Sequence, residues 1–561
     1  MKGRSGVPIA ERFDGKNRIK RPVQACLTPS QSTRRPSGMT FTTLTFPIFL
    51  AIIFALYWSV RSGNAQNRTL LAASYLFYAW WDWRFCFLML ASSIVDFEIA
   101  RRIAQTASLK KRRYLLTLSI IANLGLLGTF KYFNFFMENF THFAAQLGWQ
   151  PDVTTIALVL PLGISFYTFQ TLGYTIDVYR KQVQPAKGLI EYLAFVSFFP
   201  QLVAGPIERA KTMLPQFRQQ RRFDMTLASD GARQMLWGFF KKMVIADRLA
   251  VAVTPVFDDP SMYSGPHLMM ATVFFAFQIY CDFSAYSDIA IGTAKLFSIE
   301  LTRNFAYPYF SQSVSEFWRR WHISLSYWFR DYVYIPLGGS RTTPVRHRLN
   351  LLITFLLSGL WHGSAWRFIA WGGLNGIAVA LPGLGSSKLT PPRKSQGSET
   401  SIKHNKSGTG NSSKILNQPN ANQKLGSGDA TPGGESFLPR PGTLLRIYST
   451  FAILCAAWIL FRATSFQDAI LIYQRIFIDL VNLEAYTELT HLLDADRYQR
   501  KTAVFLLAFV CWEWVFRRDA HAFKLNRVPT ALRWILYTIL IWSTMYLMPK
   551  TGTGEFVYFE F

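Results

Sequence analysis

Residues 349–371 read LNLLITFLLSGLWHGSAWRFIAW, an apolar run interrupted by the polar stretch Ser358-Gly359-Leu360-Trp361-His362-Gly363. A membrane-spanning helix needs about 20 mostly apolar residues. An ionisable side chain inside such a segment is costly and usually faces a cavity or a partner. Histidine is also the commonest general base, because its unperturbed pKa of about 6.5 lies near working pH. The run therefore predicts a membrane helix with a functional histidine, His362. The plainer alternative is a buried histidine bonded to a backbone carbonyl.

Composition points the same way. The chain has 561 residues, of which 50% are hydrophobic and 17% charged, whereas soluble domains average about 25% charged residues. The net charge of +27 is concentrated in basic clusters between apolar segments, such as 110–113. That pattern is typical of cytoplasmic loops beside anionic lipid and argues against nucleic-acid binding. The five cysteines contain no CxxC pair, so neither a disulfide framework nor a zinc site is indicated.

The apolar runs predict an all-α, polytopic membrane protein with roughly ten to thirteen transmembrane or re-entrant helices. We expect the 268–297 run to form a pair of short helices. The strong candidates lie near 44–60, 70–90, 114–133, 154–172, 268–297, 349–366, 368–383, 446–464, 502–516 and 532–548, and weaker ones lie near 189–207, 234–256 and 468–482.

One segment, residues 192–209, does not suit a straight crossing. It contains Pro200, Gly205 and Pro206, which break helices. Both flanking loops are basic, and the positive-inside rule favours a cytoplasmic location for each. We therefore expect this segment to enter the membrane and return, as broken backbone can where it is buried in protein.

Four regions follow from these patterns. Residues 1–38 are basic and polar, and we expect a disordered extension, with Met39 as the true start. Residues 39–383 form the predicted membrane core. Residues 384–443 are rich in Ser, Gly, Asn, Lys and Pro, which predicts a disordered low-complexity linker. Residues 444–561 are expected to form the C-terminal membrane helices.

A second aromatic stretch, residues 315–340, reads SEFWRRWHISLSYWFRDYVYIPLGGS. Its large apolar residues recur at spacings of 3, 4 and 3, which predicts one face of an amphipathic helix that is interfacial or re-entrant. These residues are Trp318, Trp321, Leu325 and Trp328.

The same stretch carries ionisable residues. His322 is a second candidate functional histidine. Arg319 and Arg330 have the chemistry for phosphate or carboxylate recognition, and lipid-headgroup anchoring is the alternative. Trp318 and Trp361 are candidates for shielding or stacking on a substrate. Trp366 has the same candidate role.

Two acids, Asp282 and Asp288, lie in the apolar stretch YCDFSAYSD. Because intramembrane acids usually pair, we favour ion pairs with Arg303 or Arg319, and Asp282 remains a substrate-binding candidate. No phosphate-binding loop, HExxH motif, dinucleotide fingerprint or G-x-S-x-G elbow is present. ATP-driven transport, zinc proteolysis and serine hydrolysis therefore have no support, and no metal or bound cofactor is predicted.

Several stretches together resemble the membrane-bound O-acyltransferases, and most closely the bacterial branch that acts in alginate O-acetylation and teichoic acid D-alanylation. The resemblance covers most of 39–383 and, more weakly, 444–561. The matching stretches are FFPQLVAGPIER (198–209), GFFKKMVIADRLA (238–250), YCDFSAYSDIAIG (280–292), NFAYPYFSQSVSEFWRRWHISLSYWFRDYVYIPLGG (304–339) and SGLWHG (358–363).

The resemblance implies a helical ring with a central funnel that leads to His362 as the base. His322 would orient the substrate or stabilise developing charge. The C-terminal FVYFEF (556–561) resembles an aromatic ending of this branch, and Tyr558 is a candidate acyl relay, with an interfacial anchor as the alternative.

The resemblance also implies partners and a location. The donor would be an acyl thioester, with acetyl-CoA the simplest case. An extracytoplasmic SGNH-type acetyltransferase would complete transfer to a polysaccharide, and the protein would be multi-pass in the bacterial cytoplasmic membrane. Two alternatives stay open: transfer of D-alanyl or another acyl group from a carrier protein, and an acyl conduit without chemistry. The conduit is disfavoured because no internal repeat is visible.

Overall fold

The computed structural model describes residues 38–149, 151, 159–381, 439–495, 497–525, 528–547 and 556. Contacts between residues of the chain divide it into two compact units, Met1–Gly38 and Met39–Phe561. The first unit lies almost wholly outside the described residues, and so does the predicted linker. Within the described ranges every regular element is a helix, in agreement with the all-α prediction.

The helices follow the predicted apolar runs. In chain order they are α1 Thr45–Ser59, α2 Gly63–Gln105, α3 Leu109–Leu127, η1 Gly128–Tyr132, α4 Phe133–Gln146, α5 Ile164–Tyr179, α6 Leu189–Ser197, α7 Phe199–Leu202, α8 Ala210–Arg218, α9 Met225–Phe240, η2 Lys241–Ala246, α10 Asp247–Asp258, η3 Pro260–Met262, α11 Gly265–Leu296, η4 Pro308–Phe310, α12 Val314–Arg320, α13 Ile323–Phe329, η5 Arg330–Tyr334, α14 Pro344–His362, α15 Trp366–Ala380, α17 Pro441–Arg462, α18 Phe466–Ile478, η6 Asp479–Val481, α19 Leu483–Ala495, α20 Arg497–Phe516 and α21 Thr530–Leu547.

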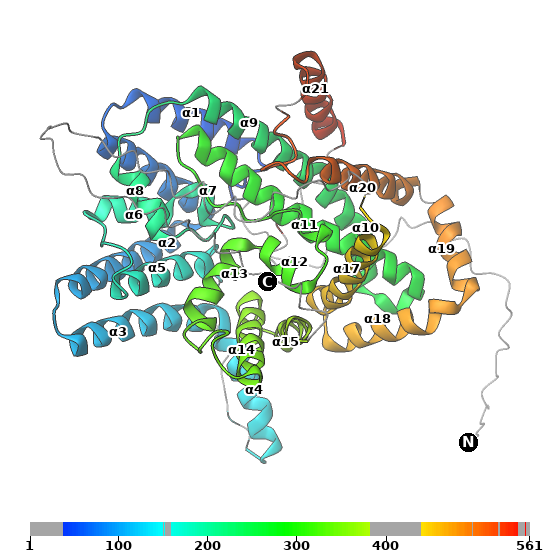
Figure 1. The fold of residues 1–561 in the computed structure, drawn as a ribbon. Helices are drawn as coiled ribbons and strands as arrows, with labels where there is room; N and C mark the ends of the chain where they lie inside the picture. Colours follow the sequence, from blue (N-terminus) through cyan, green and yellow to red (C-terminus); the bar gives the residue numbers. More distant parts are fainter. Residues whose placement is uncertain are drawn as a thin grey trace, which may run out of the picture. The chain divides into compact units, whose positions relative to one another are not determined.

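Three of the described helical stretches are long and apolar enough to cross a membrane: Leu109–Gln146, Gly265–Leu296 and Pro441–Arg462. α11 is one helix of 32 residues, so the prediction of two short helices at 268–297 was wrong. Its only proline, Pro266, lies at the first helical turn, where proline is tolerated. The apolar window of α11 is 78% buried, and the helix runs through the middle of the helical body (Figure 1).

Residues 189–218 fold back on themselves. α6 has nine residues, about 14 Å of helix, which is far less than the roughly 30 Å hydrocarbon core. The chain breaks at Phe198, forms the single turn α7 and continues into α8, which packs on α6. The start of α6 and the end of α8 are joined by an ion pair of 2.8 Å between Glu191 Oε1 and Arg218 Nε. The start of α6 and the end of α8 therefore lie together, and the re-entrant path of 192–209 through the membrane stays a prediction.

The aromatic stretch 315–340 differs from its prediction. It forms two seven-residue helices, α12 and α13, with a break at Trp321 and His322. The four apolar residues that predicted one amphipathic face are all buried, so the stretch is covered by protein and does not lie flat at an interface. In Figure 1 these short helices occupy the middle of the helical body, beside α11 and α15.

The C-terminal part completes this core. α17 begins at Pro441, three residues before the predicted boundary at 444, because proline is well suited to the first position of a helix. α17 packs on α15 and on α11, and α18 also packs on α11. Residues on both sides of the undescribed segment thus share one hydrophobic core.

Candidate functional site

His362 is the last residue of α14, and its side chain is 4% exposed. Within the part of the chain that the structure describes, aromatic rings from three helices pack around its imidazole. The centroid distances are 4.8 Å to Trp361, 5.0 Å to Trp371 of α15 and 5.5 Å to Phe461 of α17. The ring therefore lies where α14, α15 and the C-terminal part of the chain meet.

The glycines around His362 allow close packing. A Cβ on Gly359 would lie 2.2 Å from the Phe368 carbonyl oxygen, and one on Gly363 would lie 2.1 Å from the Phe368 ring. The Phe368 ring fills the space beside Gly363. Trp366 is 61% exposed and bonds Asn139, so it does not shield the histidine.

A π-helical turn, η1, holds the end of α14. Lys131 Nζ donates to the carbonyl oxygens of Trp361 at 2.8 Å and of His362 at 3.1 Å. The Tyr132 hydroxyl donates to the Leu360 carbonyl at 2.9 Å. The last four carbonyls of a helix lack partners within the helix, and three of them find these donors. The contact fixes the backbone that carries His362.

His322 lies at the break between α12 and α13, and its side chain is fully buried. Its backbone is left-handed, with φ 42° and ψ 55°. Such a conformation costs about 1–3 kcal/mol in a residue with a side chain and is typical of functional sites. Asn304 fastens the turn, because its backbone carbonyl accepts from Ile323 N at 3.0 Å.

The Asn304 side chain also sets the tautomer of His322. Asn304 Oδ1 lies 3.1 Å from His322 Nδ1 and 3.3 Å from Ser324 N. A backbone N–H can only donate, which identifies the accepting atom as the amide oxygen. Nδ1 therefore carries a proton. In the neutral ring the lone pair is then on Nε2, which is buried and has no hydrogen-bond partner among the described residues.

The two histidines share a neighbour. The Trp361 ring lies 6.1 Å from the His322 ring and 4.8 Å from the His362 ring, between centroids. Phe283 also packs edge-on against His322 at 4.7 Å. The structure thus brings together three predicted site residues, His322, Trp361 and His362, from two separate segments.

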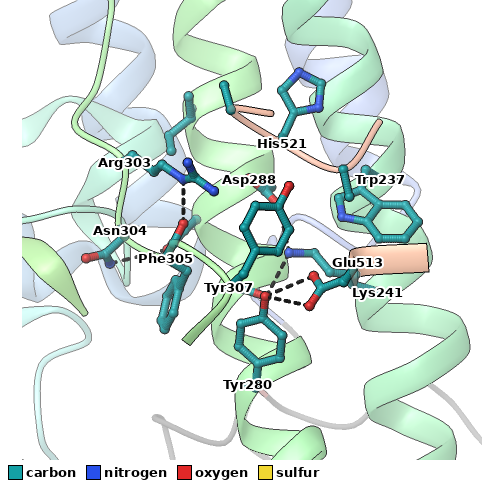
Figure 2. Close-up of a pocket in the computed structure, with 15 residues that line it drawn as sticks. Trp237, Lys241, Tyr280, Asp288, Arg303, Asn304, Phe305, Tyr307, Glu513 and His521 are labelled. Atoms are coloured by element: carbon teal, nitrogen blue, oxygen red, sulfur yellow. Dashed lines mark hydrogen bonds and ion pairs between the residues drawn. The ribbon is translucent and has the colours of Figure 1, made fainter. Parts of the chain in front are cut away.

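Asn304 also lines a small polar cavity (Figure 2). Its volume of about 20 Å³ is room for about one water and too little for a sugar or a coenzyme. Lys241 pairs with Asp288 at 2.6 Å, and the Tyr280 hydroxyl donates to Glu513 at 2.9 Å. The charged lining is largely satisfied internally, which fits a role in joining α9, α11 and α20.

Asp282 is also ion-paired. It is 1% exposed, and its carboxylate lies 2.7 Å from Lys242 Nζ, which also meets Asp247 at 2.9 Å. Pairing of the two acids was expected, but the partners found are Lys241 and Lys242 of the π-helix η2. The arginines that had been expected, 303 and 319, do not form these pairs. Asp282 is therefore engaged inside the protein.

The remaining candidates are spread apart. Trp318 is buried and packs on Trp371 at 5.7 Å, which connects it to the rings around His362. Arg319 and Arg330 are exposed, and Arg330 pairs with Asp331 at 2.7 Å. Neither arginine contacts the histidines in the interactions found.

The predicted relay, Tyr558, lies outside the described residues. Phe556, two residues earlier, is described and buried. Its ring lies 5.7 Å from Phe283 and 5.2 Å from Tyr286. Since Phe283 packs on His322, the Phe556 ring lies one ring away from that histidine.

Two residues of this site were missed in the sequence, Lys131 and Asn304. Lys131 interrupts the apolar run 114–133, and a charge within a spanning segment is a signal of function. Asn304 gives no such signal, because asparagine is common in turns.

Comparison with known proteins identifies the family. Residues 186–391 match the profile of MBOAT, the membrane-bound O-acyltransferase family. A probable alginate O-acetylase AlgI from Azotobacter vinelandii is 41% identical over 60% of this chain and 66% of its own length. A peptidoglycan O-acetyltransferase from Helicobacter pylori is 38% identical over 59% of this chain and 68% of its own length.

A teichoic acid D-alanyltransferase from Streptococcus thermophilus is more distant, at 30% identity over 40% of this chain and 58% of its own length. The chain covers just under two thirds of the alginate relative from Azotobacter vinelandii. The match to the Helicobacter pylori protein exceeds two thirds of that protein at 38% identity. The profile match spans the segments that carry Asn304, His322 and His362. This chain belongs to the membrane-bound O-acyltransferase family.

Proposed function

We propose that this protein is an O-acyltransferase that passes an acyl group, most simply acetyl, from a thioester to a hydroxyl of a polysaccharide outside the cytoplasm. The observation that carries the proposal is the pair His322 and His362, buried around one tryptophan ring. Acyl transfer between a thioester and an alcohol needs a base for the hydroxyl proton and a site closed to water, because water would hydrolyse the donor.

In this proposal His362 takes the proton of the attacking hydroxyl as the oxygen bonds to the acyl carbon. The carbonyl electrons move to the carbonyl oxygen and then return as the carbon–sulfur bond breaks. The imidazolium gives its proton to the leaving thiolate. The products are an ester and a free thiol, and His362 returns to its starting state.

His322 has a different task in the proposal. Its Nδ1 proton is committed to Asn304, so the neutral ring has only a lone pair to offer, at Nε2. A lone pair can accept a hydrogen bond from a hydroxyl, and it cannot donate one to a negatively charged oxygen. The geometry therefore supports His322 as the group that orients the hydroxyl, the first of the two roles suggested by the resemblance.

The donor in the proposal is acetyl-CoA, which reaches the histidines through a funnel from the cytoplasm. The acceptor is an alginate-like secreted polysaccharide, and an extracytoplasmic SGNH-type acetyltransferase completes the transfer. The protein is multi-pass in the bacterial cytoplasmic membrane. The alginate and peptidoglycan relatives support acetyl transfer to envelope or secreted polymers by their names.

Tyr558 is the relay in this proposal. Two extended residues span at most about 7 Å, so a chain anchored at Phe556 can bring Tyr558 close to Phe283 and His322. In this proposal His362 activates the Tyr558 hydroxyl, which then takes the acyl group. Tyr558→Phe keeps the ring and removes the oxygen. Loss of acetylation at unchanged protein abundance supports the relay, and unaltered acetylation eliminates it.

D-Alanyl transfer to a teichoic-acid-like polymer is the second candidate, supported by the 30% identity to a teichoic acid D-alanyltransferase. A gene neighbourhood with a carrier protein and its adenylating ligase favours this candidate. Polysaccharide synthases beside a secreted esterase-like protein favour acetyl transfer.

The test of the proposed function is the ester-linked acetyl content of the cell's exopolysaccharide, in the unaltered strain and in one that carries His362→Ala. Membrane abundance of both proteins is measured in parallel. We expect acetyl to fall to background while the variant stays in the membrane. Unchanged acetyl means that this polymer is not the target or that His362 is structural, and D-alanyl and other acyl esters are then measured in the same two strains.

A further inference from the structure

Three lysines in the helical core each meet a carboxylate. The Nζ-to-oxygen distances are 2.6 Å for Lys241 with Asp288, 2.7 Å for Lys242 with Asp282 and 2.5 Å for Lys295 with Asp230. This pairing is the rule for ionisable groups inside membrane proteins, since an uncompensated charge is costly there.

Lys131 departs from that rule. It lies within Leu109–Gln146, one of the three stretches fit to span a membrane. No ion pair found within the described ranges includes it, and its Nζ donates only to the carbonyls of Trp361 and His362. Lysines near a membrane surface often extend toward water, but this one points inward, to the end of α14.

Capping α14 accounts for only part of this arrangement. A cation is favoured at the negative end of a helix dipole, and Lys131 occupies that position. The neighbouring Tyr132 hydroxyl shows that a neutral donor suffices to satisfy a carbonyl there. An ammonium has three N–H donors, and only two are used. Among the described residues one N–H donor of Lys131 is left unused beside His362, and Nζ also lies 5.9 Å from the centroid of the Trp361 ring.

The reaction proposed above generates a negative charge that needs such a partner. When the hydroxyl attacks the thioester, the carbonyl oxygen becomes an oxyanion. His322 cannot donate to it while the ring is neutral, because its only proton lies on Nδ1 and is directed at Asn304. The oxyanion therefore requires a donor from another part of the site.

We propose that Lys131 is a catalytic residue, and that its free N–H binds the carbonyl oxygen of the acyl donor and stabilises the oxyanion. This rests on the proposed function. The C–O bond forms as His362 removes the hydroxyl proton, the carbonyl π electrons move to the oxygen held by Lys131, and the C–S bond breaks as those electrons return. Lys131 keeps its protons throughout.

The test uses membrane vesicles that contain the full chain, acetyl-CoA as the donor probe, unacetylated alginate with the SGNH-type acetyltransferase as the acceptor of the acyl group, and release of free thiol as the readout. Lys131→Met keeps the length of the side chain and removes the charge and the donors. We expect the turnover rate to fall about 100- to 1,000-fold, as for loss of one oxyanion donor, while the KM for acetyl-CoA changes little. Lys131→Arg, which keeps a cation with N–H donors, is expected to recover part of the rate.

Tyr132→Phe is the matched control, because it removes one neutral cap from the same helix end. We expect it to lose less than about tenfold in rate, as for one ordinary hydrogen bond, and to match Lys131→Met in thermal stability. The inference is overturned if Lys131→Met turns over as fast as this control, or if Lys131→Met changes only the KM for acetyl-CoA. It is also overturned if the fall in rate follows a loss of thermal stability, or if Lys131→Arg is as inactive as Lys131→Met. Thiol release that disappears in His362→Ala but continues in Lys131→Met at the rate of the unaltered chain overturns this inference alone. Absence of release from the unaltered chain, with acetyl-CoA and with an acyl carrier-protein thioester, overturns the proposed function as well.

Discussion

The contact between α14 and α15 should be the most sensitive packing position for catalysis, and Gly359→Ala tests it. Gly359 lies one helical turn before His362. A Cβ there would lie 2.2 Å from the Phe368 carbonyl oxygen and 3.2 Å from Gly372 Cα. These are backbone atoms, so no side-chain rotation can relieve the clash.

The magnitude follows from the missing distance. Ordinary van der Waals contact begins near 3.4 Å, so α14 and α15 must separate by about 1 Å to admit the methyl group. Overpacking of this kind costs about 1–3 kcal/mol of stability. A displacement of 1 Å in a catalytic group can cost about 10²-fold in rate. We expect acyl transfer to fall about 100-fold in a protein that still folds.

The assay compares acyl ester formation and thermal stability in membranes that contain the unaltered protein, Gly359→Ala or Gly125→Ala. Gly125 is the control because a Cβ there meets nothing within 4 Å, so alanine should raise helix stability by up to about 1 kcal/mol. Full activity of Gly359→Ala at normal stability would refute the close contact and its role in placing His362.

Three further outcomes follow. Asn304→Ala frees the His322 tautomer, and we expect acyl transfer to drop about 10²- to 10⁴-fold, with a shifted pH–rate profile; an unchanged profile contradicts the assigned tautomer. Asp282→Ala leaves Lys242 with one of its two carboxylates, which should lower stability by about 3 kcal/mol and leave the KM for donor unchanged; a raised KM at normal stability would instead favour substrate binding. Cysteine tags in the loops on either side of 192–209 should react from the same face of the membrane, and labelling from opposite faces excludes the re-entrant path.

Much of the fold could be predicted from apolar length and helix-breaking residues. The runs 349–366, 368–383 and 446–464 each became one helix, with ends shifted by a few residues. Residues 268–297 were misjudged, because length suggested two short helices while the burial that permits one long core helix is a tertiary property. For residues 315–340 the prediction of one continuous helix was wrong because a contact with a distant residue interrupts the helix. Their spacing fits a helix locally, but the backbone breaks where Asn304, which lies 18 residues before His322, bonds its ring.

The same division applies to the site. His322, Trp361 and His362 could be found because aromatic residues and histidine are conspicuous inside apolar runs. Asn304 could not, because its importance arises only when residues 304 and 322 are brought together. Lys131 could be recognised as a charge within an apolar run, but its proposed role depends on its contact with a helix end more than 200 residues away in the sequence.

The placement of the proposed reactive groups follows from what a membrane interior permits. Regular helices satisfy all their internal backbone groups and offer no donors or acceptors to a substrate. His362 lies at a helix end, His322 at a left-handed break, and Lys131 in a π-helical turn. Each interruption leaves polar groups that need partners, and those partners position the reactive side chains: Asn304 sets the tautomer of His322, and the free carbonyls of α14 hold Lys131. If one of these breaks became regular helix, its backbone groups would bond each other, and the contact that positions the proposed reactive group would be lost. We therefore expect helix-stabilising substitutions at the three breaks to lower acyl transfer activity while they raise stability.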